Sequence, residues 1–152
     1  IDADKFTIAD ETSIPTGELV SVKGTPMDFT EPKAPARDIE ADYEPLKLGN
    51  GYDHNWALNH EAGEMALAAK ATDETSGRTM EVYTDLPGIQ FYTANSLNTE
   101  LGKGGVTYHA RDGYCFETQF FPDAINKPAF ASPVLKAGEE YKTTTIYKFS
   151  VE

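Results

Sequence analysis

One acidic side chain interrupts a run of aromatic and β-branched residues between Gly113 and Asn126, which reads GYCFETQFFPDAIN. If this run is a strand, alternation places Glu117 on the same face as Cys115 and Gln119. A carboxylate held between large apolar neighbours loses part of its hydration, and in such settings carboxylates act as general acids and bases. Glu117 is therefore a candidate for proton transfer. The spacing alone is also typical of a polar residue on a half-buried strand, and that alternative stays open.

Two further polar side chains stand in short segments that follow turn signals. Asp53 lies in GNGYDHNWAL (Gly49–Leu58), and Gln90 lies in TDLPGIQFYTAN (Thr84–Asn95). Asp53 is also typical of a solvated carboxylate after a Gly-Asn-Gly turn, and Gln90 of a cross-strand polar residue on a sheet face. Trp56 in the first segment would either stack against a ligand or pack in the core.

Other residues that carry chemistry in proteins show no convincing pattern. His54, His60 and His109 lack metal-ligand spacing, and no cysteine cluster accompanies them. Cys115 paired with a histidine is a formal alternative, but a thiol between aromatic residues favours a small core hydrophobe. The glycine-rich stretch 101–105 lacks the Lys-Ser/Thr ending of a phosphate loop, so we expect an ordinary loop there.

Length, charge and cysteine content argue against several classes of protein. The chain has 152 residues, a formal net charge of −12, 39% hydrophobic and 25% charged residues. An acidic surface repels nucleic acid and anionic membranes, whereas a neutral ligand such as a sugar is indifferent to it. No apolar run is long enough to cross a bilayer, and the single cysteine gives no sign of secretion, so we expect a cytoplasmic protein. The chain opens on Ile1 directly in a strand-like pattern, so we expect either that it was cut from a longer protein or that its beginning was removed.

Short β-rich segments alternate with turn signals along the chain. A Pro-rich loop with one helical turn near residues 37–42 is expected over Met27–Glu44. The Ala-rich segment Glu64–Ala71 has helix propensity, but its hairpin-like position favours a strand. This pattern predicts an all-β fold, an antiparallel β-sandwich forming a single domain over residues 1–152. The expected strands are Lys5–Ala9, Glu18–Val22, Tyr52–Leu58, Glu64–Ala71, Arg78–Thr84, Ile89–Thr93, the run around Glu117, and Glu140–Val151.

These segments together resemble one family. The runs around Asp53, Gln90 and Glu117 are similar to the C-terminal part of the aldose 1-epimerases, the galactose mutarotases. The segments IPTGELVSV (Ile14–Val22) and SPVLKAGEEYKTTTIYKFSV (Ser132–Val151) resemble the same family in the same order. The resemblance implies a large antiparallel β-sandwich with a sugar groove on one sheet.

The resemblance also implies an activity and its residues. Family members interconvert the α and β anomers of free hexoses such as glucose and galactose by general acid–base ring opening, which needs neither metal nor cofactor. It assigns the catalytic base to Glu117 and substrate binding to Asp53 and Gln90. It implies a monosaccharide substrate, and no nucleic-acid or membrane partner is expected.

The chain also departs from the family's pattern. The general-acid histidine, a second histidine and an Asn-Arg pair all belong to the family's preceding half, and none of those blocks occurs here. We therefore expect activity only with the N-terminal half of the same enzyme as a partner. A non-catalytic carbohydrate-binding sandwich and a sugar-phosphate mutarotase remain as alternatives. The second would need basic groups for the phosphate, and this segment is acidic.

Overall fold

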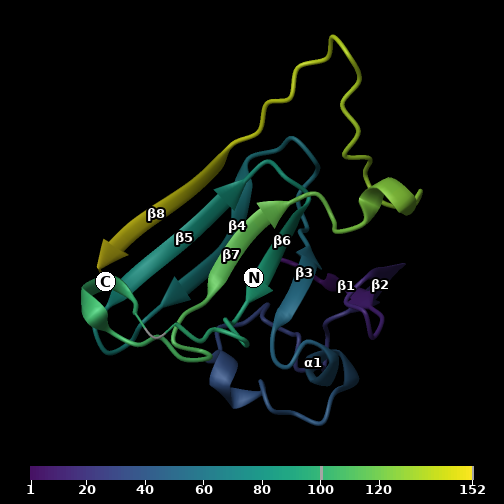
Figure 1. Cartoon of the computed structure of the whole chain (residues 1–152). Helices are drawn as coiled ribbons and strands as arrows, with labels where there is room; N and C mark the ends of the chain where they lie inside the picture. The colour runs from purple at the N-terminus through teal and green to yellow at the C-terminus, as the bar shows by residue number, and fades with distance from the viewer. Residues whose placement is uncertain (100, 152) are drawn as a thin grey trace.

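The computed structural model describes residues 1–99 and 101–151, which fold almost entirely into strands, turns and loops (Figure 1). Within residues 1–99 and 101–151, three single turns of 3-10 helix occur, at Pro35–Arg37, Lys103–Gly105 and Ala124–Asn126. The strands and the one short α-helix of the described residues are β1 (Lys5–Ala9), β2 (Pro15–Ser21), α1 (Glu44–Leu48), β3 (Asp53–Ala57), β4 (Ala66–Thr72), β5 (Arg78–Thr84), β6 (Gly88–Tyr92), β7 (Cys115–Gln119) and β8 (Thr145–Val151).

The strands form two antiparallel sheets. The larger sheet has the order β2-β1-β3-β6-β7, and the smaller one has the order β4-β5-β8. Neighbouring strands in the larger sheet come from distant parts of the chain, since β7 pairs with β6 after a long loop. The order of the larger sheet thus brings three sequence segments together along β3, β6 and β7 (Figure 1).

The Ala-rich segment forms strand β4, as expected, rather than a helix. It pairs with β5 over its whole length. The connecting turn is closed locally, because the Asp73 carboxylate accepts hydrogen bonds from the Thr75 N–H and the Ser76 hydroxyl, and Gly77 adopts a φ of 71°. Cross-strand pairing and this turn outweigh the helix propensity of the alanines.

One hydrophobic core is shared by the two sheets. The larger sheet, together with Phe29 and Tyr52 in the segments before β3, contributes a cluster of contacting rings, and the smaller sheet contributes small side chains, chiefly Ala68, Ala69 and Val82. Edge-to-face ring packing and close contact of the small residues are typical of a sandwich interior. The rings of the core are those of Phe6, Phe29, Tyr52, Trp56, Phe91 and Phe116.

Four elements differ from the sequence-based expectation. Strand β2 begins at Pro15, three residues before the expected start at Glu18, and ends at Ser21. Helix α1 was not expected, and the 3-10 turn lies at Pro35–Arg37 rather than further on. The closing strand begins at Thr145, not at residue 140, because its partner β5 ends at Thr84, the residue opposite Thr145. Beyond that point residues 140–144 have no strand to pair with, and the Asp85 carboxylate accepts the Thr144 N–H instead.

No helix within residues 1–99 and 101–151 combines the length and the hydropathy that a membrane span requires.

Candidate functional site

The polar candidates from three segments share one face of the larger sheet, which we call the polar face. The strand register aligns them in three rows across β3, β6 and β7. Because side chains alternate along a strand, the intervening residues point into the core. The polar face consists of Asp53, Asn55, Gln90, Tyr92, Cys115, Glu117 and Gln119.

A chain of side-chain hydrogen bonds links this face. Gln90 Nε2 donates to Asp53 Oδ1 at 2.8 Å. Gln119 Nε2 donates to Gln90 Oε1 at 3.0 Å and to Asn55 Oδ1 at 3.2 Å. Asp53 and Gln90 therefore lie in direct contact, and Gln90 lies directly opposite Glu117 in the register of β6 and β7.

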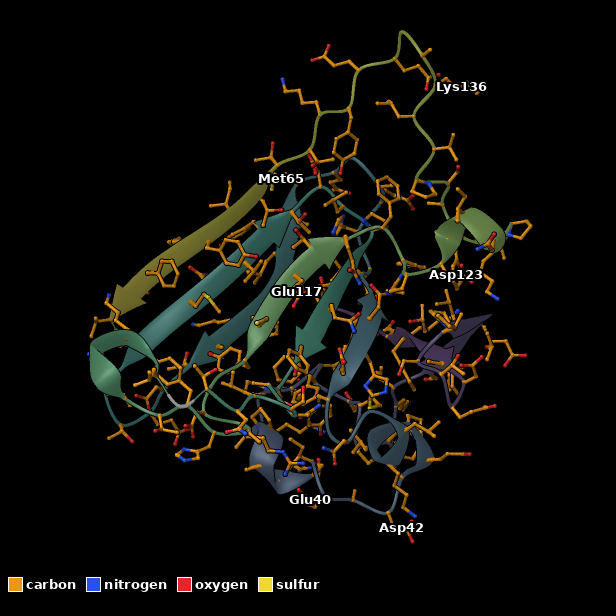
Figure 2. The ribbon with its side chains drawn as sticks, viewed as in Figure 1. Glu40, Asp42, Met65, Glu117, Asp123 and Lys136 are labelled. Carbon is orange, nitrogen blue, oxygen red and sulfur yellow. The ribbon has the colours of Figure 1, made fainter. Side chains whose placement is uncertain are left out.

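Glu117 is exposed in this chain, which corrects the expectation that apolar neighbours hold its carboxylate. The alternation around it is as expected, with Phe116 buried and Cys115 and Glu117 on the opposite face. The aromatic residue directly before it, Phe116, is buried on the core side of the sheet, so it does not cover the carboxylate. Figure 2 shows Glu117 on β7 at the surface of the sheet.

Cys115 is also exposed, so the expectation of a small core residue is wrong. It shares the polar face with Glu117 because the two residues are two positions apart on β7. Partial burial raises the pKa of the Cys115 thiol, and the negative charge of Glu117 raises it further. A thiol held protonated is a poor nucleophile, which argues against cysteine chemistry here.

His54 supports Asp53 from beneath. Its Nδ1 accepts the Asp53 backbone N–H at 3.1 Å, and its Nε2 lies 3.1 Å from the carbonyl of Pro45 in α1. These partners fix the tautomer, with the proton on Nε2. Burial lowers the pKa of His54 to about 4, so the ring is neutral at pH 7 and ties strand β3 to α1.

The turn that precedes Asp53 is held by buried polar side chains. Asn95 Nδ2 donates to the carbonyls of Gly49 and Tyr52, both at 3.0 Å. Gly51 has a φ of 127°, and a Cβ there would lie 2.4 Å from Asn95 Oδ1. Asn95 can therefore bind the carbonyls of the Gly-Asn-Gly turn only because residue 51 has no side chain. These contacts fix the position at which β3 begins.

Trp56 packs in the core. It is 0% exposed, and its indole Nε1 donates to the Met27 carbonyl at 3.0 Å. This leaves no ring face for a ligand in this chain, so the stacking alternative is excluded here.

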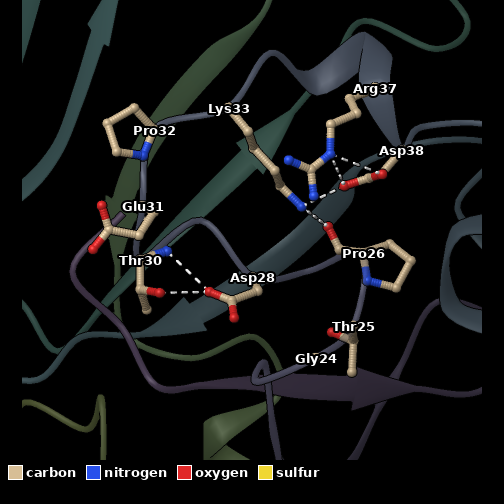
Figure 3. A pocket seen from close by; sticks show the side chains of 10 residues that line it. All are labelled: Gly24, Thr25, Pro26, Asp28, Thr30, Glu31, Pro32, Lys33, Arg37 and Asp38. Carbon is tan, nitrogen blue, oxygen red and sulfur yellow. Dashed lines mark hydrogen bonds and ion pairs between the residues drawn. The ribbon is translucent and has the colours of Figure 1, made fainter.

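A cavity of about 450 Å³ lies away from the polar face, in the loop around Lys33 (Figure 3). Lys33 Nζ binds the Pro26 carbonyl at 2.7 Å and Asp38 at 2.8 Å, and it lies 4.4 Å from the centre of the Phe29 ring. These contacts tie the loop to itself and to the core, which indicates a structural role for this cation.

The sequence predicts site residues at Asp53, Gln90 and Glu117, but it assigns no role to Asn55 or Gln119 and does not predict the support by His54. The signal for the first two was present, since each lies two residues from a candidate on the same strand and hence on the same face. Within residues 1–99 and 101–151, no group of three or more His, Cys, Asp or Glu side chains is placed to hold a metal ion.

A family model described as Aldose 1-epimerase matches residues 1–148. The galactose mutarotase of Bos taurus is 45% identical over 152 residues, which cover 99% of this chain and 43% of that protein. The aldose 1-epimerase of Escherichia coli strain K12 is 35% identical over 152 residues, which cover 99% of this chain and 44% of that protein.

A solved structure has the same arrangement of strands. The GalM/aldose epimerase homologue from C. elegans superposes with a TM-score of 0.84 at 28% sequence identity, covering 99% of this chain and 44% of that chain. The chain thus spans less than half the length of the relatives that it matches.

Proposed function

The chain belongs to the aldose 1-epimerase family, and we propose that it supplies the base and part of the sugar-binding face of a mutarotase. The fold class expected from the sequence, an antiparallel β-sandwich of the galactose mutarotase type, is confirmed by the superposition on a family member. The residue roles and the substrate that follow are our proposal.

Anomer exchange requires opening of the sugar ring. A base removes the proton of the C1 hydroxyl while an acid protonates the ring oxygen, the aldehyde rotates, and the ring closes again with the two roles exchanged. In this proposal Glu117 acts as the general base. Its exposed carboxylate stands on the polar face, opposite the Gln90 amide, where a bound sugar can reach it.

Asp53 and Gln90 bind the sugar hydroxyls. The Asp53 carboxylate accepts hydrogen bonds, whereas the Gln90 amide both donates and accepts. Their mutual hydrogen bond of 2.8 Å holds the two side chains as one unit. A neutral polyhydroxylated ring such as glucose or galactose suits a face of amides and carboxylates, since each buried hydroxyl needs a partner.

The observation that carries the proposal is the convergence of three sequence segments on this single face. Asp53 touches Gln90, and Gln90 pairs across the sheet with Glu117, although the three residues are far apart in the chain. The face thus offers carboxylates and amides side by side, which are the groups that pair with the hydroxyls of a sugar.

The acid is proposed to come from the N-terminal half of the same enzyme. The chain covers 43% of the length of the Bos taurus galactose mutarotase. Large apolar side chains on β8, such as Phe149 and Val151, are exposed, and residues 127–144 extend away from both sheets, as Figure 2 shows at Lys136. We propose that the N-terminal half covers these surfaces, so that residues 1–152 and that half form one active unit.

A second candidate, a non-catalytic carbohydrate-binding sandwich, is favoured by one observation. The seven residues of the polar face include a base but no histidine to act as its acid, and His54 is buried on the core side. A sugar-phosphate mutarotase is disfavoured, because the same seven described residues include no Lys or Arg to bind a phosphate.

Polarimetry on freshly dissolved α-galactose and α-glucose tests the proposal, using this chain together with its N-terminal half. We expect accelerated mutarotation, reduced about 100-fold or more in Glu117→Gln. Glu18→Gln, which neutralises an exposed carboxylate on β2, is the matched control and should retain full activity. Near-normal rates in Glu117→Gln would refute the assignment of the base, and sugar binding without acceleration would favour the binding module.

We also propose a cytoplasmic protein with no nucleic-acid or membrane partner. This is supported by the net charge of −12 and the single cysteine.

A further inference from the structure

We propose that Gln119 is a positioning residue for sugar binding, which holds Gln90 and, through it, the carboxylate of Asp53. The buried side chain of Asn55 accepts a hydrogen bond from Gln119 and so holds it in place. This inference rests on the proposed function, because it concerns how the same site is kept in its binding geometry. Gln119 itself need not touch the substrate.

Gln119 is the residue of the polar face that hydrogen-bonds to side chains on both other strands, β3 and β6. Its Nε2 lies 3.0 Å from Gln90 Oε1 and 3.2 Å from Asn55 Oδ1, so one amide group joins β7 to both β6 and β3. In the register of the sheet Gln119 lies opposite Gly88. A Cβ at Gly88 would come within 2.5 Å of Asn55 Oδ1, so the glycine leaves the space in which this contact forms.

The direction of the hydrogen bonds is set by Asp53. A carboxylate only accepts, so Gln90 must turn its NH₂ group to Asp53 and its oxygen to Gln119. That oxygen in turn requires a donor from Gln119. Without this donor the Gln90 amide is free to rotate and to present its oxygen to Asp53, which would separate the two sugar-binding groups by repulsion.

The hydrogen bonds of Gln119 involve a buried polar residue, Asn55, and not only polar residues at the surface. Its side chain is 1% exposed, and its Nδ2 has no hydrogen-bond partner among the residues that the structure describes. A buried amide is costly when unpaired, and the contact with Gln119 satisfies its oxygen. A polar residue kept buried at this position is explained if its task is to hold Gln119.

The test measures kcat and KM for α-galactose by polarimetry, on this chain together with its N-terminal half. Gln119→Met keeps the shape of the side chain and removes the hydrogen bonds. We expect KM to rise about threefold to tenfold, and kcat to stay within about twofold, since the chemistry at Glu117 is untouched. Gln119→Glu should raise KM at least as much, because a carboxylate cannot donate to Gln90.

A double variant separates positioning from a role of its own. If Gln119 acts through Gln90, then Gln90→Ala combined with Gln119→Met should have the KM of Gln90→Ala alone. An unchanged KM in Gln119→Met, or effects that multiply in the double variant, would overturn the inference. If Gln119→Met does not fold, the same KM values are compared for Gln119→Glu, alone and combined with Gln90→Ala. An unmodified protein that does not accelerate mutarotation refutes the proposed function instead, so the two failures are distinguishable.

Discussion

The two faces of strands β3, β6 and β7 share one backbone and one register but have opposite properties. On the core face, rings pack edge to face or stacked, as Phe91 does against Trp56 and Phe116. On the polar face, adjacent residues such as Gln90 make a few directional hydrogen bonds and remain accessible. A shift of one position therefore moves a side chain from core packing to hydrogen bonding on an accessible face.

Under the proposed function, this difference separates stability from sugar binding within the same strands. Core packing contributes several kcal/mol per large side chain, whereas a partly exposed hydrogen bond contributes about 1 kcal/mol. Accessible residues of the polar face such as Gln90 can therefore be altered at little cost to the fold, whereas the rings of the core face cannot. The residue pair Phe91 and Gln90 gives the most direct test.

Phe91→Ala should produce the largest loss of stability. The side chain is buried, and its removal leaves a cavity among rings, which we expect to lower the free energy of unfolding by about 3–5 kcal/mol. Gln90→Ala, one residue away on the opposite face, should cost about 1 kcal/mol or less and act on sugar binding instead. Urea denaturation of both variants measures the difference, and similar losses would contradict the division between the faces.

His54, which is buried on the core face, should make the free energy of unfolding depend on pH. Burial lowers its pKa in the folded protein to about 4 from an ordinary value of 6.5, so the unfolded chain takes up the proton first as the pH falls. The stabilisation is complete above about pH 6.5, and about 3 kcal/mol should be lost between there and pH 4.

Denaturation curves at several pH values test the prediction for His54. Carboxylates whose pKa is lowered by hydrogen bonds, such as Asp10 and Asp73, start from an ordinary value of 3.8 and act mainly below this window. His54→Gln should be less stable at pH 7 but nearly flat between pH 6.5 and 4. An equal slope in that variant and in the unmodified protein would refute the assignment to His54.

Gly88→Ala should affect both stability and sugar binding to a moderate degree. The added Cβ would lie 2.5 Å from Asn55 Oδ1 and 2.9 Å from the Phe121 ring, so both must move. We expect a loss of about 1–3 kcal/mol, together with a raised KM for sugar as the contact between Asn55 and Gln119 is broken. Gly113→Ala is the matched control, because its Cβ would have nothing within 4 Å. Equal melting temperatures for the two variants would contradict the proposed close contact.

Much of the larger sheet could be predicted from local sequence. The alternation at β7 places Phe116 and Glu117 on opposite faces, and turn signals bracket β3 and β6. The segment of β4 could also be recognised, because its position before a turn outweighed its alanine content.

The connections across the sheet could not be predicted in the same way. The contact of Gln119 with Asn55 spans 64 residues and depends on the strand order β3-β6-β7, which no local pattern contains. The exposure of Glu117 likewise depends on what lies above its face, and the composition of its own strand does not report that. The pairing of β8, which begins only at Thr145, is set by the length of its partner β5.

A third surface, the outer part of β8, should show the smallest effect. Phe149 is 73% exposed although it is large and apolar, so in this chain it contributes neither to the core nor to the polar face. Phe149→Ser should change the free energy of unfolding of the isolated chain by about 0.5 kcal/mol or less. It should also reduce self-association, because exposed apolar groups on an edge strand promote it. Thermal melting and sedimentation measure both effects. A loss near that of Phe91→Ala would show that Phe149 already packs as a core residue, and it would remove the reason for placing the N-terminal half against β8.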